Sequence, residues 1–254
     1  DTVFDHVIEG KEVGAPGSGV FVCTWRHWRE ISDEEDSFSV SPLTSFEDVF
    51  VPTVQSTAMS YVVDHLVGVG RPVLMTGVQG CGKTSTCLHI LQNMQSKAAH
   101  DSKYGNASGA ARYGTKMMKL ISTNFSARTT VEGLQQTVEQ KLHRINNELF
   151  GSSPDHENII FVDDVNLPAS DAYGSQPVSE FMRQLLERKG FYDRDEHIWK
   201  KVVDTKFVAS AKCAIKGQNV LDQRFLNKFT VLFLPSPSRE SIKEIYNKSV
   251  NLFF

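Results

Sequence analysis

Cysteine is scarce in this chain, and its few cysteines lack the spacing of a metal or redox site. The four cysteines are Cys23, Cys81, Cys87 and Cys213, and no two of them form a C-x-x-C pair. No histidine accompanies them at zinc-binding spacing. This pattern predicts reduced thiols, as in a cytosolic-type compartment.

Long apolar runs and an excess of positive charge are also absent. No run of about 18 apolar residues occurs, so no membrane span is predicted, and no basic-then-apolar secretory leader is present. The formal net charge of −3 argues against a surface built mainly to bind nucleic-acid phosphates. The chain starts at Asp1 and stops in an apolar tail at Phe254, and we expect it to be a piece of a longer polypeptide. Its composition, 40% hydrophobic and 22% charged, is that of a globular protein with a sizeable core.

One stretch matches the phosphate-binding pattern G-x-x-x-x-G-K-[ST]. Glycines allow left-handed backbone angles close to an anion, and successive N–H groups at a helix N-terminus bind phosphates. An apolar run at 72–75 predicts a strand before the stretch, and apolar spacing from Ser85 onward predicts a helix after it. We expect Lys83 to reach the β and γ phosphate oxygens and Thr84 to hold Mg²⁺. The predicted nucleotide-binding residues are Gly77, Val78, Gln79, Gly80, Cys81, Gly82, Lys83, Thr84 and Ser85.

A second chemical signal is an apolar run at 159–162 that ends in two acids, Asp163 and Asp164. In open α/β sheets the ligand lies at the carboxyl ends of the strands. We therefore expect Asp163 to hold the water shell of Mg²⁺ and Asp164 to orient or deprotonate an attacking water. A strand that simply ends in a polar turn is the alternative, and the phosphate loop earlier in the chain favours the metal interpretation.

Hydrophobic periodicity predicts an α/β fold, with a mostly parallel central sheet flanked by helices and a β-hairpin insertion. Thr53 is expected to cap the first of these helices, the acidic run at 32–36 to form a solvated loop, and residues 96–115 a flexible surface insertion. Helices are expected at 54–69, 130–148, 177–189 and 239–250, and a short helix or turn at 222–229. Strands are expected at 20–25, 117–121, 206–211 and 231–234, and the hairpin strands at 190–193 and 198–203.

This order of elements resembles the large subdomain of an AAA+ ATPase and, more narrowly, the third AAA+ module of axonemal dynein heavy chains. The resemblance covers nearly the whole chain, least well at 1–50 and 96–116. It implies a lead-in segment at 1–50 and an AAA+ large subdomain at 51–254, without the small helical lid. The motifs that carry it, besides the phosphate loop, are 51–53, 124–129, 161–168, 173–177, 183–184, 190–193 and 224–226.

The resemblance also implies a role for individual residues. Lys83 and Thr84 match the Walker A lysine and threonine, and Asp163 matches the Walker B metal residue. Arg224 matches the arginine finger, a catalytic residue that acts in trans on the nucleotide of the neighbouring module. Two positions depart from the family pattern. Asp164 stands where a catalytic glutamate is usual, and Lys212 stands where a polar sensor, often asparagine, is expected.

The implied function is that of an ATP-binding module in a microtubule motor. With Mg²⁺ as cofactor and ATP or ADP bound, it would regulate coupling between the main ATPase site and microtubule binding. The implied partners are neighbouring AAA+ modules and, through the full protein, intermediate chains, light chains and microtubules. Nucleic acid and membrane are not expected as partners. The implied location is the cytoplasm and cytoskeleton, in the axoneme of a cilium or flagellum.

Alternative functions remain open at the level of sequence. The module is expected to be a slow or inactive ATPase in isolation, and a structural module that only holds its nucleotide is the main alternative. A small-molecule or nucleoside kinase shares the phosphate loop, but neither the acids at 163–164 nor the turn at Arg224 is expected there. The same objection applies to a nucleic-acid translocase. The net negative charge of the chain also argues against it.

Overall fold

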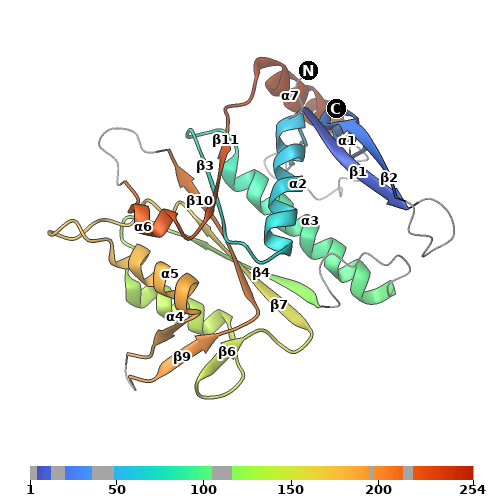
Figure 1. Cartoon of the computed structure of the whole chain (residues 1–254). Helices are drawn as coiled ribbons and strands as arrows, with labels where there is room; N and C mark the ends of the chain where they lie inside the picture. Colours follow the sequence, from blue (N-terminus) through green and yellow to red (C-terminus); the bar gives the residue numbers. More distant parts are fainter. Residues whose placement is uncertain are drawn as a thin grey trace. The chain divides into compact units, whose positions relative to one another are not determined.

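The computed structural model of this chain describes residues 5–12, 21–35, 49–104, 116–194, 197–213 and 220–253 (Figure 1). These residues fall into two compact units. The larger unit is Val63–Ser236, and the smaller unit combines Asp1–Val62 with Pro237–Phe254. The phosphate loop and the predicted acidic strand both belong to the larger unit.

A five-stranded sheet in the order β11-β3-β10-β7-β4 forms the centre of the larger unit. Every neighbouring pair in it is parallel, so the carboxyl ends of all five strands lie at one edge. The predicted α/β class with a parallel central sheet is therefore confirmed. The strands are β3 (Val73–Gly77), β4 (Met117–Asn124), β7 (His156–Asp163), β10 (Thr205–Lys212) and β11 (Thr230–Leu234).

Helices cover both faces of this sheet because its strands are apolar on both faces. On one face, Cys87 of α3 (Lys83–Tyr104) lies with its sulfur 3.6 Å from that of Met75 in β3. On the other face, Ile160 and Val162 of β7 belong to a core that includes residues of α4 (Val131–Lys141) and α5 (Pro177–Arg188). Phe161, between them in the sequence, points to the opposite face and is fully buried.

A smaller sheet in the order β5-β6-β9-β8 lies beside this core. Its antiparallel pair β8–β9 is the predicted hairpin, so that prediction is confirmed. Trp199 packs edge-on against Tyr192, with 4.9 Å between ring centroids, as expected of a packing residue. The strands are β5 (His143–Arg144), β6 (Leu149–Gly151), β8 (Gly190–Tyr192) and β9 (Trp199–Val202).

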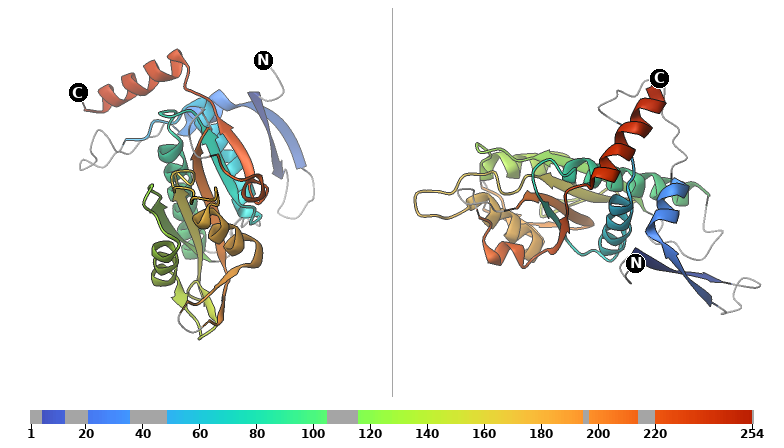
Figure 2. Two further views of the ribbon diagram at one scale, coloured as in Figure 1. Left: turned by 90° about the vertical axis from the view of Figure 1, so that its left-hand side faces the viewer. Right: turned by 90° about the horizontal axis from the view of Figure 1, so that it is seen from above.

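The smaller unit contains a hairpin and helical segments. Strands β1 (His6–Glu12) and β2 (Phe21–His27) pair antiparallel and are drawn in blue in Figure 2. Helix α1 (Trp28–Glu35) follows, and the chain ends in α7 (Arg239–Phe253). Helix α2 (Val54–Gly68) begins where predicted, and its cap is confirmed because the Thr53 hydroxyl accepts the Ser56 N–H at 3.3 Å.

Three sequence predictions are wrong in their extent. Residues 96–104 continue α3 rather than start a flexible insertion, because Ala98 extends the buried stripe of that helix; residues 105–115 lie outside the described part. The helix predicted to reach 148 ends at Lys141, because Leu142 is extended (ψ 149°) and the strands β5 and β6 follow. The acidic run is helical through Glu35, with Ser32 buried, and only Asp36 lies outside the described residues.

The burial of Phe161 gives a test of this core. Phe161→Ala should lower the free energy of unfolding by about 3–5 kcal/mol, because the truncation leaves a cavity that the surrounding packing cannot close. The matched control is Phe233→Ala on the edge strand β11, where 53% of the side chain is exposed; it should change stability by at most about 0.5 kcal/mol. Urea denaturation of both variants makes the comparison, and equal losses would contradict the assigned burial.

Candidate nucleotide-binding site

The phosphate loop connects the end of β3 to the start of α3, so the strand and helix predicted around it are confirmed. Gly80 and Gly82 have positive φ angles of 81° and 86°, which residues with a side chain rarely adopt. Gly77 is required for a different reason. A Cβ atom at Gly77 would lie 2.5 Å from the carbonyl oxygen of Leu234 on β11. Gly80 and Gly82 therefore supply the backbone angles of the loop, and Gly77 permits the close approach of β11 to the end of β3.

Lys83 is buried and turns back into the loop. Its ammonium donates to the carbonyl oxygens of Gly77 and Val78, at 3.2 and 2.9 Å. These are neutral acceptors on the chain's own backbone, and phosphate oxygens would be stronger acceptors for the same ammonium group. The side chain is thus already held beside the place where an anion would meet the loop amides and the N-terminus of α3.

Asp163 ties the acidic strand to the phosphate loop. The Thr84 hydroxyl donates to Asp163 Oδ2 at 2.8 Å, although the two residues are 79 positions apart. The Ser210 hydroxyl and the Asp164 N–H both donate to Oδ1, so the carboxylate is held by three donors. It is buried at the end of β7, which fixes its direction toward the loop.

Thr84 and Asp163 fit a magnesium ion. Mg²⁺ binds oxygen ligands, and in nucleotide sites it takes few of them from the protein and the rest from phosphates and water. The adjacent hydroxyl and carboxylate offer this kind of partial set. Within the described residues, no group of three or more His, Cys, Asp or Glu side chains is arranged to hold a metal ion by itself.

Asp164 has a strained backbone and a charged partner. Its φ angle is 54°, and its N–H also donates to the Ser210 hydroxyl at 3.1 Å. The Lys212 ammonium lies 3.6 Å from Asp164 Oδ2, which makes an ion pair at the end of β10. The backbone N–H of Lys212 donates to the side-chain oxygen of Asn166 at 3.2 Å. A cation therefore sits beside the acid that was expected to act on water.

The remaining predicted residues differ in their surroundings. Val78, Gln79, Gly80, Gly82 and Ser85 are exposed, and Cys81 is partly exposed, so the outer face of the loop is open to solvent. Arg224 is exposed on the short helix α6 (Gln223–Leu226). In the part of the chain that the structure describes, its guanidinium makes no hydrogen bond or ion pair. The structure thus brings Lys83, Thr84 and Asp163 together, with Asp164 next to them, and shows no hydrogen bond or ion pair between Arg224 and these described residues.

Sequence reasoning missed the role of Ser210. This serine is fully buried in β10, and its hydroxyl contacts both acids of β7. A single polar residue within the apolar run 207–211 was the available signal, because a buried hydroxyl needs a partner. The identity of that partner depends on strand order, which the run itself does not encode.

Cys87 lies one turn after the start of α3. Burial raises the pKa of its thiol well above the usual range, and the Asp163 carboxylate adds to the rise, while Lys83 opposes it. The thiol therefore stays protonated at neutral pH and contributes packing against Met75 rather than a nucleophile.

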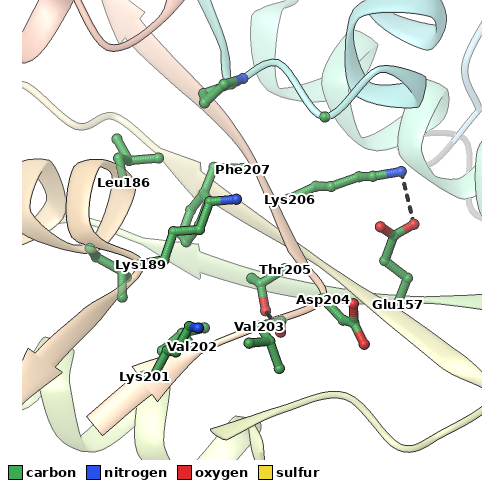
Figure 3. Close-up of a pocket in the computed structure, with 13 residues that line it drawn as sticks. Glu157, Leu186, Lys189, Lys201, Val202, Val203, Asp204, Thr205, Lys206 and Phe207 are labelled. Carbon is green, nitrogen blue, oxygen red and sulfur yellow. Dashed lines mark hydrogen bonds and ion pairs between the residues drawn. The ribbon is translucent and has the colours of Figure 1, made fainter. Parts of the chain in front are cut away.

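A separate cavity of about 450 Å³ lies at the opposite edge of the sheet (Figure 3). It opens at the amino-terminal ends of β7 and β10. Its Lys206 pairs with Glu157 at 2.8 Å, and its Asp204 pairs with Lys116 at 3.0 Å. None of the predicted nucleotide-binding or metal-binding residues lines it.

Comparison with known proteins identifies a family that this chain matches. Residues 38–108 and 108–237 match the family described as "P-loop containing dynein motor region". The chain is 33% identical to human dynein axonemal heavy chain 6 over 208 residues, which are 82% of this chain and 5% of that protein. It is 28% identical to human dynein axonemal heavy chain 10 over 88% of this chain and 4% of that protein.

A flagellar relative extends the comparison. The dynein-1-alpha heavy chain of the flagellar inner arm I1 complex from Chlamydomonas reinhardtii is 26% identical over 87% of this chain and 4% of that protein. The chain thus spans only about one twentieth of the length of these relatives. Among the described residues, no helix is both long enough and apolar enough to cross a membrane. The family match, which covers the phosphate loop, the acidic strand and the short helix α6, shows that this chain belongs to the P-loop-containing dynein motor regions.

Proposed function

We propose that this chain is the third AAA+ module of an axonemal dynein heavy chain and that it binds Mg-ATP or Mg-ADP. The observation that carries the proposal is the hydrogen bond from Thr84 to Asp163, which joins the phosphate loop to the acidic strand. A glycine turn without a ligand would need no such link to a buried carboxylate. Axonemal relatives support a place in the cytoskeleton of a cilium or flagellum.

Each residue has a defined task in this proposal. The loop amides and the N-terminus of α3 receive the phosphates, and Lys83 exchanges its carbonyl acceptors for phosphate oxygens. Thr84 and Asp163 hold Mg²⁺, which neutralises phosphate charge when bound. Ser210 positions Asp163 by its hydrogen bond to Oδ1.

Within a motor ring, the bound nucleotide would act as a regulatory ligand. A ligand shifts a conformational equilibrium only by its difference in affinity for the two states. Exchange of ATP for ADP would thereby alter coupling between the main ATPase site and microtubule binding. Arg224, whose guanidinium has no hydrogen-bond or ion-pair partner among the described residues, would reach the nucleotide of the neighbouring module. Intermediate chains, light chains and microtubules would be partners of the complete heavy chain.

A module that holds its nucleotide without hydrolysing it is the second candidate. The pairing of Asp164 with Lys212 favours it, because a carboxylate whose oxygen lies 3.6 Å from a lysine ammonium is less available to orient an attacking water. Asp164 is also one methylene shorter than glutamate, and a small displacement of a catalytic group can cost about 100-fold in rate. Multiple-turnover ATPase in the assembled ring that is lost on Asp164→Asn would rule this candidate out.

Lys83→Ala tests nucleotide binding directly. A hydrogen bond to a charged group contributes about 1.5–3 kcal/mol, and each 1.4 kcal/mol is a tenfold change. Losing the ammonium should therefore weaken Mg-ATP binding by about 100-fold in titration calorimetry. Lys97→Ala, at an exposed position of the same helix, is the matched control and should leave the affinity unchanged. Wild-type affinity in Lys83→Ala would remove the basis of the proposal.

Ser210→Ala tests the positioning of the metal carboxylate. Without the hydroxyl, Asp163 loses one of its three donors, so the Mg²⁺ concentration needed for half-maximal ATP binding should rise about tenfold. Binding in the absence of Mg²⁺, measured with EDTA present, should change by less than about twofold. An equal loss with and without Mg²⁺ would mean that Ser210 acts through general stability alone.

Arg224→Ala separates binding from action in trans. In this chain, nucleotide affinity should stay unchanged, because the guanidinium makes no hydrogen bond with the described loop residues. In the complete heavy chain, turnover at the neighbouring nucleotide site should fall by about 1,000-fold if that site hydrolyses ATP. Arg188→Ala, an exposed arginine of α5, is the control. A weaker affinity in the isolated chain would place Arg224 in its own site instead.

A further inference from the structure

The cavity of about 450 Å³ at the amino-terminal edge of the central sheet combines apolar and charged side chains (Figure 3). Its apolar lining includes Leu185 and Leu186 of α5, Val202 of β9 and Phe207 of β10. All of the lining residues belong to the larger unit, so the cavity is complete within one compact part of the chain. A volume of this size is typical of pockets that bind small molecules through an apolar surface and a few polar groups.

The acids that line the cavity already have cationic partners. The Glu157 carboxylate lies 2.8 Å from the Lys206 ammonium, which also belongs to the lining. The Asp204 carboxylate lies 3.0 Å from the ammonium of Lys116 on β4's amino-terminal side. Both carboxylates are therefore paired, and neither is available to a bound cation without loss of an ion pair.

Two lysines of the same lining remain unpaired. Neither the Lys189 nor the Lys201 ammonium has a hydrogen bond or an ion pair with any residue that the structure describes. In Figure 3 they come from α5 and β9 at one side of the view, and the Lys206–Glu157 pair lies at the other side. A cleft that carries an excess of one charge raises the local concentration of ions of the opposite charge. The unpaired lysines therefore favour an anion.

The backbone fixes where both lysines begin. Lys189 follows α5 in a left-handed conformation, with φ 49° and ψ 49°, at a cap position where glycine is usual. Its carbonyl accepts the Val202 N–H at 2.7 Å, and Lys201 is paired in register with Gly190 across the β8–β9 ladder. Left-handed angles are unfavourable for a residue with a side chain. Such strain is often found at functional sites, which fits a role for the Lys189 side chain.

We propose that this cavity binds a small organic anion, in which a carboxylate, sulfonate or phosphate is attached to an apolar ring or chain. Lys189 and Lys201 bind the anionic group, and the apolar side chains cover the rest of the ligand. An inorganic anion would use the lysines but leave the apolar lining exposed to water. The cavity shares no residue with the predicted nucleotide site, so the proposal does not depend on the proposed function.

Two dyes separate the contribution of charge from that of apolar contact. Anilinonaphthalenesulfonate carries a sulfonate on an aromatic body, and phenylnaphthylamine has the same aromatic body without the sulfonate. In fluorescence titrations of this chain, Lys189→Met and Lys201→Met should each weaken binding of the sulfonate dye about threefold, and the double variant about tenfold. Binding of the neutral dye should change by less than about twofold, because methionine keeps an apolar stem of similar length.

The control variant is Lys97→Met, at an exposed lysine of α3 that does not line the cavity. It should match the wild type with both dyes. Unchanged binding of the sulfonate dye in the double variant, or equal weakening of both dyes, would overturn the proposal. Saturating Mg-ADP should not displace the sulfonate dye, and displacement would place the dye at the phosphate loop instead. A chain that fails to bind Mg-ADP would contradict the proposed function alone.

The wild type provides a second measurement if a variant fails to fold. Raising the KCl concentration from about 0.05 M to about 0.5 M should weaken binding of the sulfonate dye about threefold, because salt screens exposed ion pairs. Binding of the neutral dye should not weaken. An equal response of the two dyes to salt would contradict the role of the unpaired lysines.

Discussion

The hydrogen bond between Thr84 and Asp163 is the contact on which the arrangement of the site depends. It joins segments 79 positions apart, and it forms only because β3 and β7 flank the same strand, β10. All three strands are parallel, so their carboxyl ends meet at one edge. Ser210 of β10 completes the link by donating to the same carboxylate. The sheet order is thus what converts two local motifs into one site.

Asp164, at the same edge of the sheet, has an unfavourable backbone conformation. Asp164 has a φ angle of 54° without being glycine, and such conformations cost on the order of 1–3 kcal/mol. Its N–H is held by the Asp163 carboxylate and the Ser210 hydroxyl, which offset that cost. Asn166 in turn receives the N–H of Lys212. The strain is therefore stabilised by groups that also position the two charged side chains, which is the pattern expected of a functional edge.

Features carried by contiguous residues were predictable from the sequence, and those that depend on strand order were not. The glycine loop and the apolar run before Asp163 each occupy one stretch, so their local structure followed from residue type. The contact of Ser210 with Asp163 needed the knowledge that β10 lies beside β7. The extension of α3 past 96 was missed because Ala and Ser suit both a helix and a loop, and burial of Ala98 decided between them. The start of the helix expected at 130–148 was predicted to within one residue, but its end was not.

The partners of the charged side chains bear on whether this module hydrolyses its nucleotide or only binds it as a regulatory ligand. Asp163 is fully engaged by donors, while Asp164 has a lysine as its partner where a catalytic acid would need to stay free to act on water. Arg224 is exposed on α6. In the proposed function, Arg224 would act on the nucleotide of the neighbouring module, while Asp164 stays paired with Lys212 in this module. This arrangement suits a regulatory nucleotide site. Slow turnover would prolong each nucleotide-bound state, so that the bound nucleotide could determine the populations of ring conformations.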